Sequence, residues 1–227
     1  MISTAAKPLP MVVLISGSGS NLQAIIDEIE AGLPAEIRAV ISNEPDAYGL
    51  TRAREAGIPA QVINHRDYAS RKAFDQALMK CIDHYQPALI VLAGFMRILT
   101  TEFVEHYAGR MLNIHPSLLP RYQGLNTHQR VLDAGDAIHG VSVHFVTPEL
   151  DGGPVILQAE IPVHAKDDAD ALAQRIHTQE HIIYPRVIRW FAEGRLRLED
   201  NTVLLDEKPV KLPKIQEKRV KGKEYSS

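Results

Sequence analysis

The chain alternates short apolar runs with segments whose apolar residues recur every three or four positions. This alternation constrains its fold more than any other feature. The first run, 11–16, reads MVVLIS, and the segment 21–31 that follows places four apolar residues from Leu22 to Ile29 at helical spacing. Repeated strand–helix units build a mostly parallel sheet with helices on both faces, because a crossover helix must carry the chain back between parallel strands. We therefore predict an α/β protein with a doubly wound sheet.

The same pattern sets the expected order of elements. Strands are expected at 11–16, 37–42, 61–63, 89–93 and 111–115, and helices at 21–31, 48–56, 70–85 and 100–107. After about residue 137 the pattern changes, because 140–147 alternates with a period of two and 154–161 follows a Gly-Gly turn. Two neighbouring strands without a helix between them predict antiparallel additions to the sheet in the C-terminal half. A long helix is expected over 168–191, with a kink at Pro185.

Composition excludes several classes of protein. The 227 residues are 45% hydrophobic with a net charge of −3, which excludes global disorder, and a single cysteine, Cys81, excludes a disulfide scaffold. The longest apolar stretch, 88–96, is shorter than the roughly 20 residues that cross a bilayer. The run 11–15 is too short for the core of a signal peptide. We therefore expect a cytoplasmic protein with no membrane partner.

Charge divides the chain into two parts. Residues 208–227 hold seven Lys or Arg and two Glu, a local charge of +5, whereas the other 207 residues hold 18 basic and 26 acidic groups, or −8. We expect a single domain over 1–207 and a basic, flexible tail over 208–227. A basic tail can contact nucleic acid, but apart from Tyr225 this one lacks aromatic side chains for base stacking. A solvated extension without a nucleic-acid partner is therefore expected; the oligomeric state is left open.

A glycine-rich loop, SGSGSN at 16–21, lies between the first expected strand and helix. Small residues let the backbone approach an anion, and the helix N-terminus adds free N–H groups and the positive end of its dipole. Ser20 or Asn21 can cap the helix or donate to a phosphate. Leu22 replaces the third glycine of a dinucleotide fingerprint, and no Gly-Lys-Ser/Thr of a P-loop is present. The loop alone leaves a phosphate site and a tight structural turn equally open.

Two further motifs carry groups suited to acyl transfer. Asn113 and His115 stand two apart at the end of an expected strand, so their side chains point to the same side at the edge where open α/β sheets bind ligands. An amide donor beside an imidazole suits stabilisation of an oxyanion and proton transfer. Asp151, on the turn LDGGP, can meet His115 and favour its protonated form. A structural histidine and a solvated turn aspartate remain the alternatives for these residues taken singly.

The segment 177–181, HTQEH, matches the H-x-x-E-H pattern of some zinc proteases. His177 and His181 stand four apart and share a helix face. The pattern is short, ten histidines make chance matches easier, and the sequence indicates no third ligand. We expect no metal.

Together these motifs resemble the phosphoribosylglycinamide formyltransferase (glycinamide ribonucleotide transformylase) family of folate-dependent enzymes. The resemblance is carried by VLISGSGSNLQAII, SNEPDAYGLTRAREAGI, VLAGFMRIL, LNIHPSLLP, HGVSVHFVTPELDGGPVILQ and QEHIIYP, which cover residues 11 to about 197 in the family's order. Gln123 and Asn126 depart from it, because many members have proline and histidine there. The resemblance implies a Rossmann-like fold with a nucleotide-binding half at about 10–110 and a folate and catalytic half at about 111–207.

The resemblance also implies a reaction and its residues. The amine of 5'-phosphoribosylglycinamide would attack the formyl carbon of 10-formyltetrahydrofolate through a tetrahedral intermediate, in purine biosynthesis. Asn113 would hold the formyl oxygen, His115 would donate the proton, and Asp151 would favour the protonated imidazole. The implied ribonucleotide-binding residues are Gly19, Ser20, Asn21 and Glu180, and the implied folate-binding residues are Arg71, Met96, Arg97, Ile98 and Leu99.

Other activities remain as alternatives. Methionyl-tRNA formyltransferases share the Asn, His and Asp core but normally carry a sizeable C-terminal domain, for which we expect no room here. Formyltetrahydrofolate hydrolases normally have an additional N-terminal domain, whereas about ten residues precede the first expected strand. A catalytically inactive nucleotide-binding module is disfavoured because Asn113, His115 and Asp151 are all present.

Overall fold

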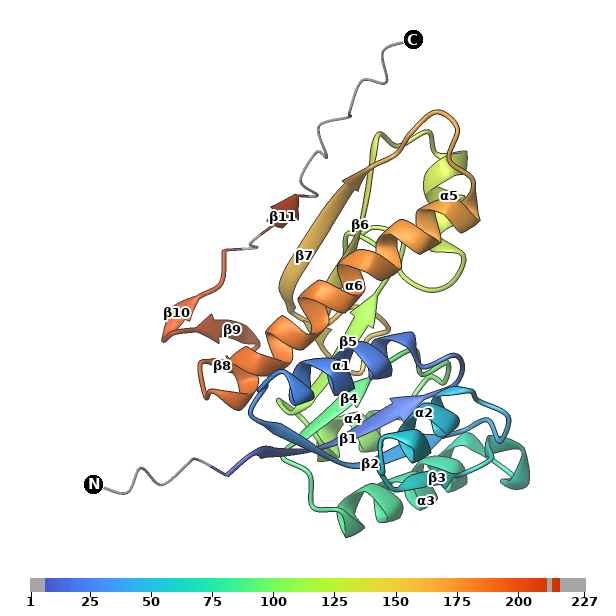
Figure 1. Ribbon diagram of the computed structural model, residues 1–227, viewed down its shortest axis with the longest axis vertical. Helices are drawn as coiled ribbons and strands as arrows, with labels where there is room; N and C mark the ends of the chain where they lie inside the picture. The colour runs from blue at the N-terminus through green and yellow to red at the C-terminus, as the bar shows by residue number, and fades with distance from the viewer. Residues whose placement is uncertain (1–6, 212–213, 217–227) are drawn as a thin grey trace.

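An eight-stranded sheet forms the centre of the fold, in the order β11-β7-β6-β5-β4-β1-β2-β3 (Figure 1). The computed structural model describes residues 7–211 and 214–216. The strands are β1 (Leu9–Ile15), β2 (Ala35–Ser42), β3 (Ala60–Val62), β4 (Leu89–Leu92), β5 (Met111–His115), β6 (Ile138–Phe145), β7 (Val155–Pro162), β8 (Leu196–Glu199), β9 (Thr202–Leu205), β10 (Lys208–Pro209) and β11 (Lys214–Gln216). The helices are α1 (Ser20–Glu30), α2 (Gly49–Glu55), the 3₁₀ helix η1 (His65–Asp67), α3 (Arg71–His84), α4 (Thr101–His106), α5 (Thr127–Asp133) and α6 (Ala169–Ala192).

The strand directions confirm the predicted fold class. Strands β3, β2, β1, β4 and β5 are parallel to one another. Strand β6 pairs antiparallel with β5, and β7 pairs antiparallel with β6. The antiparallel additions therefore lie in the C-terminal half, as the period-two alternation predicted. Helix α5 and the small antiparallel sheet of β8, β9 and β10 were not predicted.

Both faces of the central sheet are covered by helices. Along β1, Met11, Val13 and Ile15 point into the hydrophobic cluster that includes α1, α2 and α6. Val12 and Leu14 point into the opposite cluster, which includes α3 and α4. All five side chains are fully buried, and burial on both faces is the reason why this strand is apolar throughout.

Helix α6 runs along the first of these faces as a single element that continues through Pro185. The Asp168 side chain caps its N-terminus by accepting a hydrogen bond from the Ala171 N–H group at 2.8 Å. The hydroxyl of the buried Tyr184 lies 2.8 Å from the Leu92 carbonyl oxygen and 3.0 Å from that of Leu112. One side chain of α6 thus contacts the ends of both β4 and β5, the strands that lead into the site described below.

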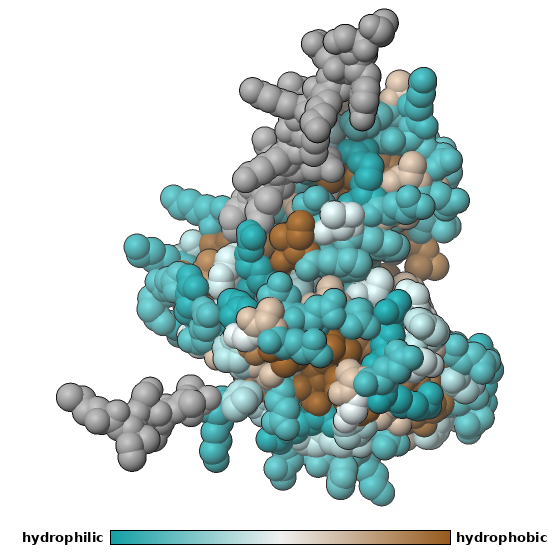
Figure 2. Space-filling model, in the orientation of Figure 1, coloured by the Kyte–Doolittle hydropathy of each residue, from teal (hydrophilic) through white to brown (hydrophobic). Residues whose placement is uncertain are grey.

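The end of the described chain returns to the sheet. Strand β11 pairs in parallel with β7, and β10 pairs with β9. The flexible tail predicted for 208–227 lies partly outside the described residues, at 212–213 and 217–227. Within the part that the structure covers, no helix is long and apolar enough to cross a membrane. Figure 2 shows a largely hydrophilic face, with hydrophobic side chains gathered mainly in its lower half.

Candidate active site

The candidate site lies where the sheet changes its winding direction. From β1 the chain adds β2 and β3 on one side, and from β4 it adds β5 on the other. The connections that leave the carboxyl ends of β1 and β4 therefore run in opposite directions. This is the usual place for a ligand crevice in an open α/β sheet. The glycine-rich loop 16–21 follows β1, the segment 93–99 follows β4, and Asn113 and His115 end β5. The fold thus brings most of the predicted site residues to one edge.

The amide of Asn113 is oriented by a histidine that the sequence did not single out. Asn113 stands opposite His144 in the antiparallel pairing of β5 and β6, and Asn113 Nδ2 lies 3.1 Å from His144 Nε2. His144 Nδ1 lies 2.8 Å from the carbonyl oxygen of Phe145, to which it donates. Burial lowers the pKa of His144, so the ring is neutral and its Nε2 accepts from the amide. One N–H of Asn113 is therefore engaged, and the other remains available for a ligand.

His115 lies between two hydrogen-bond acceptors. Its Nδ1 is 3.5 Å from Asp151 Oδ2, and its Nε2 is 3.0 Å from the carbonyl oxygen of Tyr122. The side chains of His115 and Asp151 are only 9% and 10% exposed, so their attraction is weakly screened. The Gly124 N–H group donates to Asp151 Oδ2 at 2.9 Å and fixes the carboxylate. Both ring nitrogens of His115 thus face oxygen atoms of the protein, and the ring itself lines neither of the cavities described below.

The segment that follows His115 is held by buried polar side chains. The Ser142 hydroxyl donates to the Ser117 carbonyl oxygen at 2.6 Å and accepts from the Leu119 N–H group at 3.0 Å. Gln158 Nε2 donates to the Leu119 carbonyl oxygen and to the Ser142 hydroxyl, both at 2.9 Å. These bonds supply the partners that buried backbone groups need. They fix where the chain leaves β5, and so where His115 stands.

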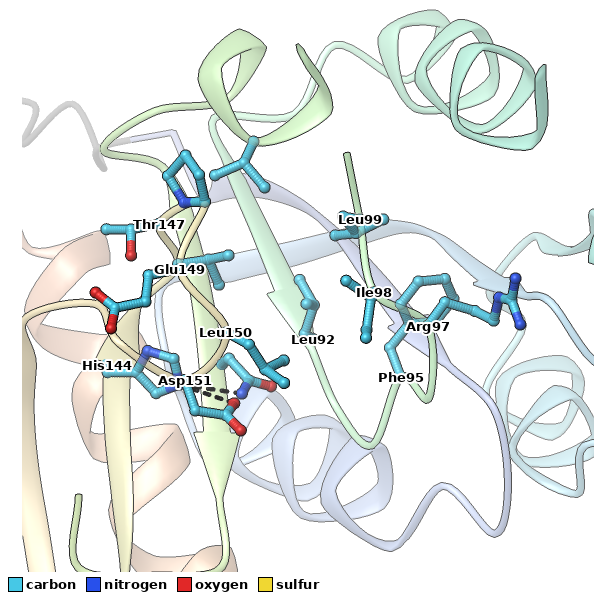
Figure 3. A pocket seen from close by; sticks show the side chains of 14 residues that line it. Leu92, Phe95, Arg97, Ile98, Leu99, His144, Thr147, Glu149, Leu150 and Asp151 are labelled. Atoms are coloured by element: carbon cyan, nitrogen blue, oxygen red, sulfur yellow. Dashed lines mark hydrogen bonds and ion pairs between the residues drawn. The ribbon is translucent and has the colours of Figure 1, made fainter. Parts of the chain in front are cut away.

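A first cavity combines apolar walls with polar side chains at one end, among them two of the residues predicted to be catalytic, Asn113 and Asp151 (Figure 3). The apolar residues Leu92, Phe95, Ile98 and Leu99 lie on one side, and His144 and Asp151 lie on the other. Such walls suit a flat heterocycle, and the polar end suits its reacting group. The other lining residues are Arg97, Val104, Asn113, Val146, Thr147, Pro148, Glu149 and Leu150.

The residues predicted to bind folate do not all line the same cavity. Arg97, Ile98 and Leu99 line the first cavity, although the guanidinium group of Arg97 points away from Asp151 (Figure 3). Met96, 67% exposed, lines the neighbouring cavity instead. Arg71 begins α3 and lines neither cavity.

A second cavity, of about 360 Å³, contains the glycine-rich loop. It is lined by Gly19, Ser20, Asn21 and Glu180, the four residues whose binding of the ribonucleotide stays a prediction. Gly19 has φ = 69°, a conformation that favours glycine, and it directly precedes α1. The free N–H groups of this helix start are oriented to bind an anion.

Asn21 and Glu180 form a buried pair in the second cavity. Asn21 Nδ2 donates to Glu180 Oε2 at 2.8 Å, between α1 and α6. Burial raises the pKa of Glu180, and the hydrogen bond from Asn21 opposes this shift. The remaining acceptor capacity of the carboxyl group suits the hydroxyl groups of a sugar.

The HTQEH segment, which matches a zinc-protease pattern in sequence, lies on α6. The rings of His177 and His181 are nearly parallel with centroids 6.4 Å apart, and His177 lines the second cavity. Within residues 7–211 and 214–216, no group of three or more His, Cys, Asp or Glu side chains is placed to hold a metal ion.

His128 is a further cavity residue that the sequence analysis missed. It lines the second cavity from α5, and its Nδ1 lies 2.9 Å from Nε2 of the buried His139. Burial and, to a smaller extent, the nearby His128 together lower the pKa of His139 to about 4. A neutral pair therefore shares one hydrogen bond, which fixes the orientation of the His128 ring.

Both cavities draw on both halves of the chain. The first combines the segment after β4 with β5, β6 and the turn at Asp151, and the second combines the loops after β1 and β4 with α5 and α6. The segment 93–99 contributes to both. The predicted division into a nucleotide half and a folate half therefore does not correspond to one cavity each.

Comparison with known proteins gives a consistent result. The formyl transferase family matches residues 9–188. The chain is 58% identical over 197 residues to the phosphoribosylglycinamide formyltransferase of Escherichia coli (strain K12), covering 86% of this chain and 93% of that protein. It is 44% identical over 196 residues to the trifunctional purine biosynthetic protein adenosine-3 of Homo sapiens, covering 86% of this chain and 19% of that protein. The phosphoribosylglycinamide formyltransferase structure from Coxiella burnetii superposes with a TM-score of 0.89 at 58% identity, covering 92% of this chain and 99% of that one.

Proposed function

The chain belongs to the formyl transferase family and is an enzyme that formylates phosphoribosylglycinamide in purine biosynthesis, and from this premise we propose how its two cavities divide the work. The second cavity binds the ribonucleotide, with its phosphate at the N-terminus of α1 and its ribose at Glu180. The first cavity binds the heterocycle of 10-formyltetrahydrofolate, the formyl donor. The formyl group then lies near Asn113 and Asp151, where the cavities approach each other.

The observation that carries this proposal is the arrangement of three side chains. Asn113 has one N–H engaged by His144, and His115 is paired with Asp151 at 3.5 Å beside it. Acyl transfer needs an oxyanion stabiliser, a proton carrier and two aligned reactants. These residues supply the first two, and the cavities supply the third.

The roles assigned to these residues follow from where charge develops during the reaction. When the amine bonds to the formyl carbon, negative charge develops on the formyl oxygen. Two N–H groups stabilise it, the free one of Asn113 and that of His115 Nε2 once this nitrogen has left the Tyr122 carbonyl oxygen. As the bond from this carbon to the folate nitrogen breaks, His115 gives its proton to that nitrogen. The proton lost by the attacking amine returns to His115, whose ring Asp151 holds in place.

Acceptor competition tests the assignment. Formyl transfer from 10-formyltetrahydrofolate is measured with phosphoribosylglycinamide, with methionyl-tRNA and with water as the acceptor, and the His115→Ala variant, purified in parallel, controls for contaminating enzyme. We expect transfer to phosphoribosylglycinamide only. Faster transfer to tRNA or water would replace this proposal by one of the alternative activities. The predicted cytoplasmic location remains part of the proposal.

A further inference from the structure

The segment 93–99 is a thin wall between the two cavities. Ala93, Gly94 and Met96 line the second cavity, whereas Phe95 and residues 97–99 line the first. Neighbouring residues of one short stretch thus face opposite cavities. Any displacement of this backbone changes the shape of both cavities at once.

One side chain from the glycine-rich loop holds this wall. The Met96 N–H group donates to Ser16 Oγ at 2.7 Å, and the Ser16 hydroxyl donates to Asn43 Oδ1 at 2.5 Å. Ser16 directly follows β1 and Met96 follows β4, so this bond joins the loops that leave the carboxyl ends of two neighbouring parallel strands. Consecutive hydrogen bonds of this kind polarise and strengthen one another.

The side chain of Asn43 is held in place by burial and by its own hydrogen-bond partners. It follows β2 and is 2% exposed. Its Nδ2 lies 3.3 Å from Glu44 Oε1 and 3.2 Å from His65 Nδ1, which leaves Oδ1 directed to Ser16. Glu44 is in turn held by two hydrogen bonds from Arg66. The relay therefore passes through the buried Asn43 and ends on the Glu44–Arg66 ion pair at the surface.

The far end of the wall has its own anchor. The Thr100 N–H group donates to Oδ2 of the buried Asp75 at 2.6 Å. Loss of the Ser16 contact would therefore release the wall near Met96 while Thr100 stays in place. Ala93 and Gly94 stay in place too, because the Ala93 N–H group donates to the Leu14 carbonyl oxygen at 2.9 Å and the Gly94 carbonyl oxygen accepts from the Ser16 N–H group at 3.2 Å. The part released is 95–99, which still carries lining residues of both cavities.

We propose that Ser16, supported by Asn43, is a positioning residue that sets the shape of the folate cavity from the ribonucleotide loop. The assignment of folate to one cavity and the ribonucleotide to the other rests on the proposed function. The hydrogen bond by which Ser16 holds the segment 93–99 does not depend on that assignment. Ser16 itself contacts neither reacting group in this assignment. Its removal should therefore weaken folate binding more than it slows the chemical step.

Kinetics of matched variants test the effect on binding. For Ser16→Ala we expect the KM for 10-formyltetrahydrofolate to rise about tenfold, the effect of one lost hydrogen bond, with a smaller fall in kcat. Ser16→Thr keeps the hydroxyl and should restore most of the lost affinity, and Asn43→Ala should act in the same direction as Ser16→Ala. Asp168→Ala, which removes a helix cap from α6 away from both cavities, serves as the stability control and should leave both KM values unchanged.

Hydrogen exchange tests the link itself, without substrates. In Ser16→Ala the Met96 amide should exchange at least about tenfold faster than in the parent, whereas the Thr100 amide should keep its rate. An unchanged Met96 exchange rate, or an unchanged folate KM in an active Ser16→Ala enzyme, would overturn the inference. A parent protein that does not formylate phosphoribosylglycinamide would overturn the proposed function instead, and the exchange rates would still decide the link. If Ser16→Ala does not fold, Asn43→Ala is read in the same two assays.

Discussion

Gly19 should tolerate no side chain, and the reason lies in its neighbour rather than in the ligand cavity. A Cβ atom added at Gly19 would lie 2.6 Å from the Cα atom of Gly49, the first residue of α2. Real Cβ atoms essentially never come within 3.0 Å of a neighbouring heavy atom, so the loop and α2 would have to separate by at least 0.4 Å, the difference between 3.0 and 2.6 Å. The Gly49 N–H group also donates to the Gly17 carbonyl oxygen at 3.0 Å, and this bond would be strained by the separation.

Two costs add in Gly19→Ala. A residue other than glycine at φ = 69° costs roughly 1–2 kcal/mol, and overpacking costs roughly 1–3 kcal/mol. The free energy of unfolding should therefore fall by about 2–5 kcal/mol, which lowers Tm by roughly 5–15 °C in a chain of this size. The displaced loop should also weaken ribonucleotide binding about 10- to 100-fold, because its N–H groups no longer point at one anion.

Urea unfolding and calorimetric titration with phosphoribosylglycinamide and with tetrahydrofolate measure these effects. Gly17→Ala is the matched control for stability, because its added Cβ has no atom within 4 Å and its φ is not in the left-handed region. We expect the unfolding free energy of this control to stay within about 0.5 kcal/mol of the parent. An unchanged stability of Gly19→Ala, or an equal loss of affinity for both ligands, would refute the reasoning.

Three further outcomes are expected. His115→Ala should lower kcat by about 10²–10⁴ and Asn113→Ala by about 10²–10³. Asp151→Asn should lower kcat much less in the His115→Ala background than in the parent, and additive losses would show that His115 and Asp151 are not coupled. Activity should survive exhaustive chelation, and a loss reversed by zinc would contradict this. The free energy of unfolding should fall as pH drops from about 6.5 to about 4, because the unfolded state protonates His139 in this range while the native state keeps it neutral. In His139→Gln this part of the fall should disappear, and an acid profile identical to that of the parent would assign the pH dependence to other groups.

The sequence predicted those parts of the fold whose apolar pattern is strong. Strand β1 is buried on both faces and therefore reads as an unbroken apolar run, and α1 and α6 carry a clear helical period. Helix α5 was missed because only Thr127 and Val131 of its seven residues are buried, too few to mark a period. Strands β8 and β9 are only four residues each, and β8 alternates apolar with charged side chains, so they too gave little signal.

The site was predictable where its residues are neighbours in sequence or carry the family resemblance. Asn113 and His115 lie on one strand, so their common direction follows from the pleat. His144 reaches Asn113 only through the register of β5 against β6, and a shift by one residue would have placed Val143 or Phe145 there. The sequence alone does not reveal this register, although the alternation in 141–146 places His144 on the same face as Ser142, opposite to Val143 and Phe145. The predicted role of Arg71 stays a prediction, since its helix lies outside both cavities.

The contacts of the Tyr184 hydroxyl with β4 and β5 have a consequence for how the protein opens. The Leu92 and Leu112 carbonyl groups sit immediately before the segments that form the crevice, and both lie within hydrogen-bond reach of one side chain on α6. Burial raises the pKa of Tyr184, so the hydroxyl keeps its proton and the contact persists across the physiological range. Fraying of these two strand ends would therefore require α6 to leave the sheet, which exposes one whole hydrophobic cluster. We therefore expect the amides of these two strands to exchange only through openings close to global unfolding, and the loops around the crevice to open at lower cost.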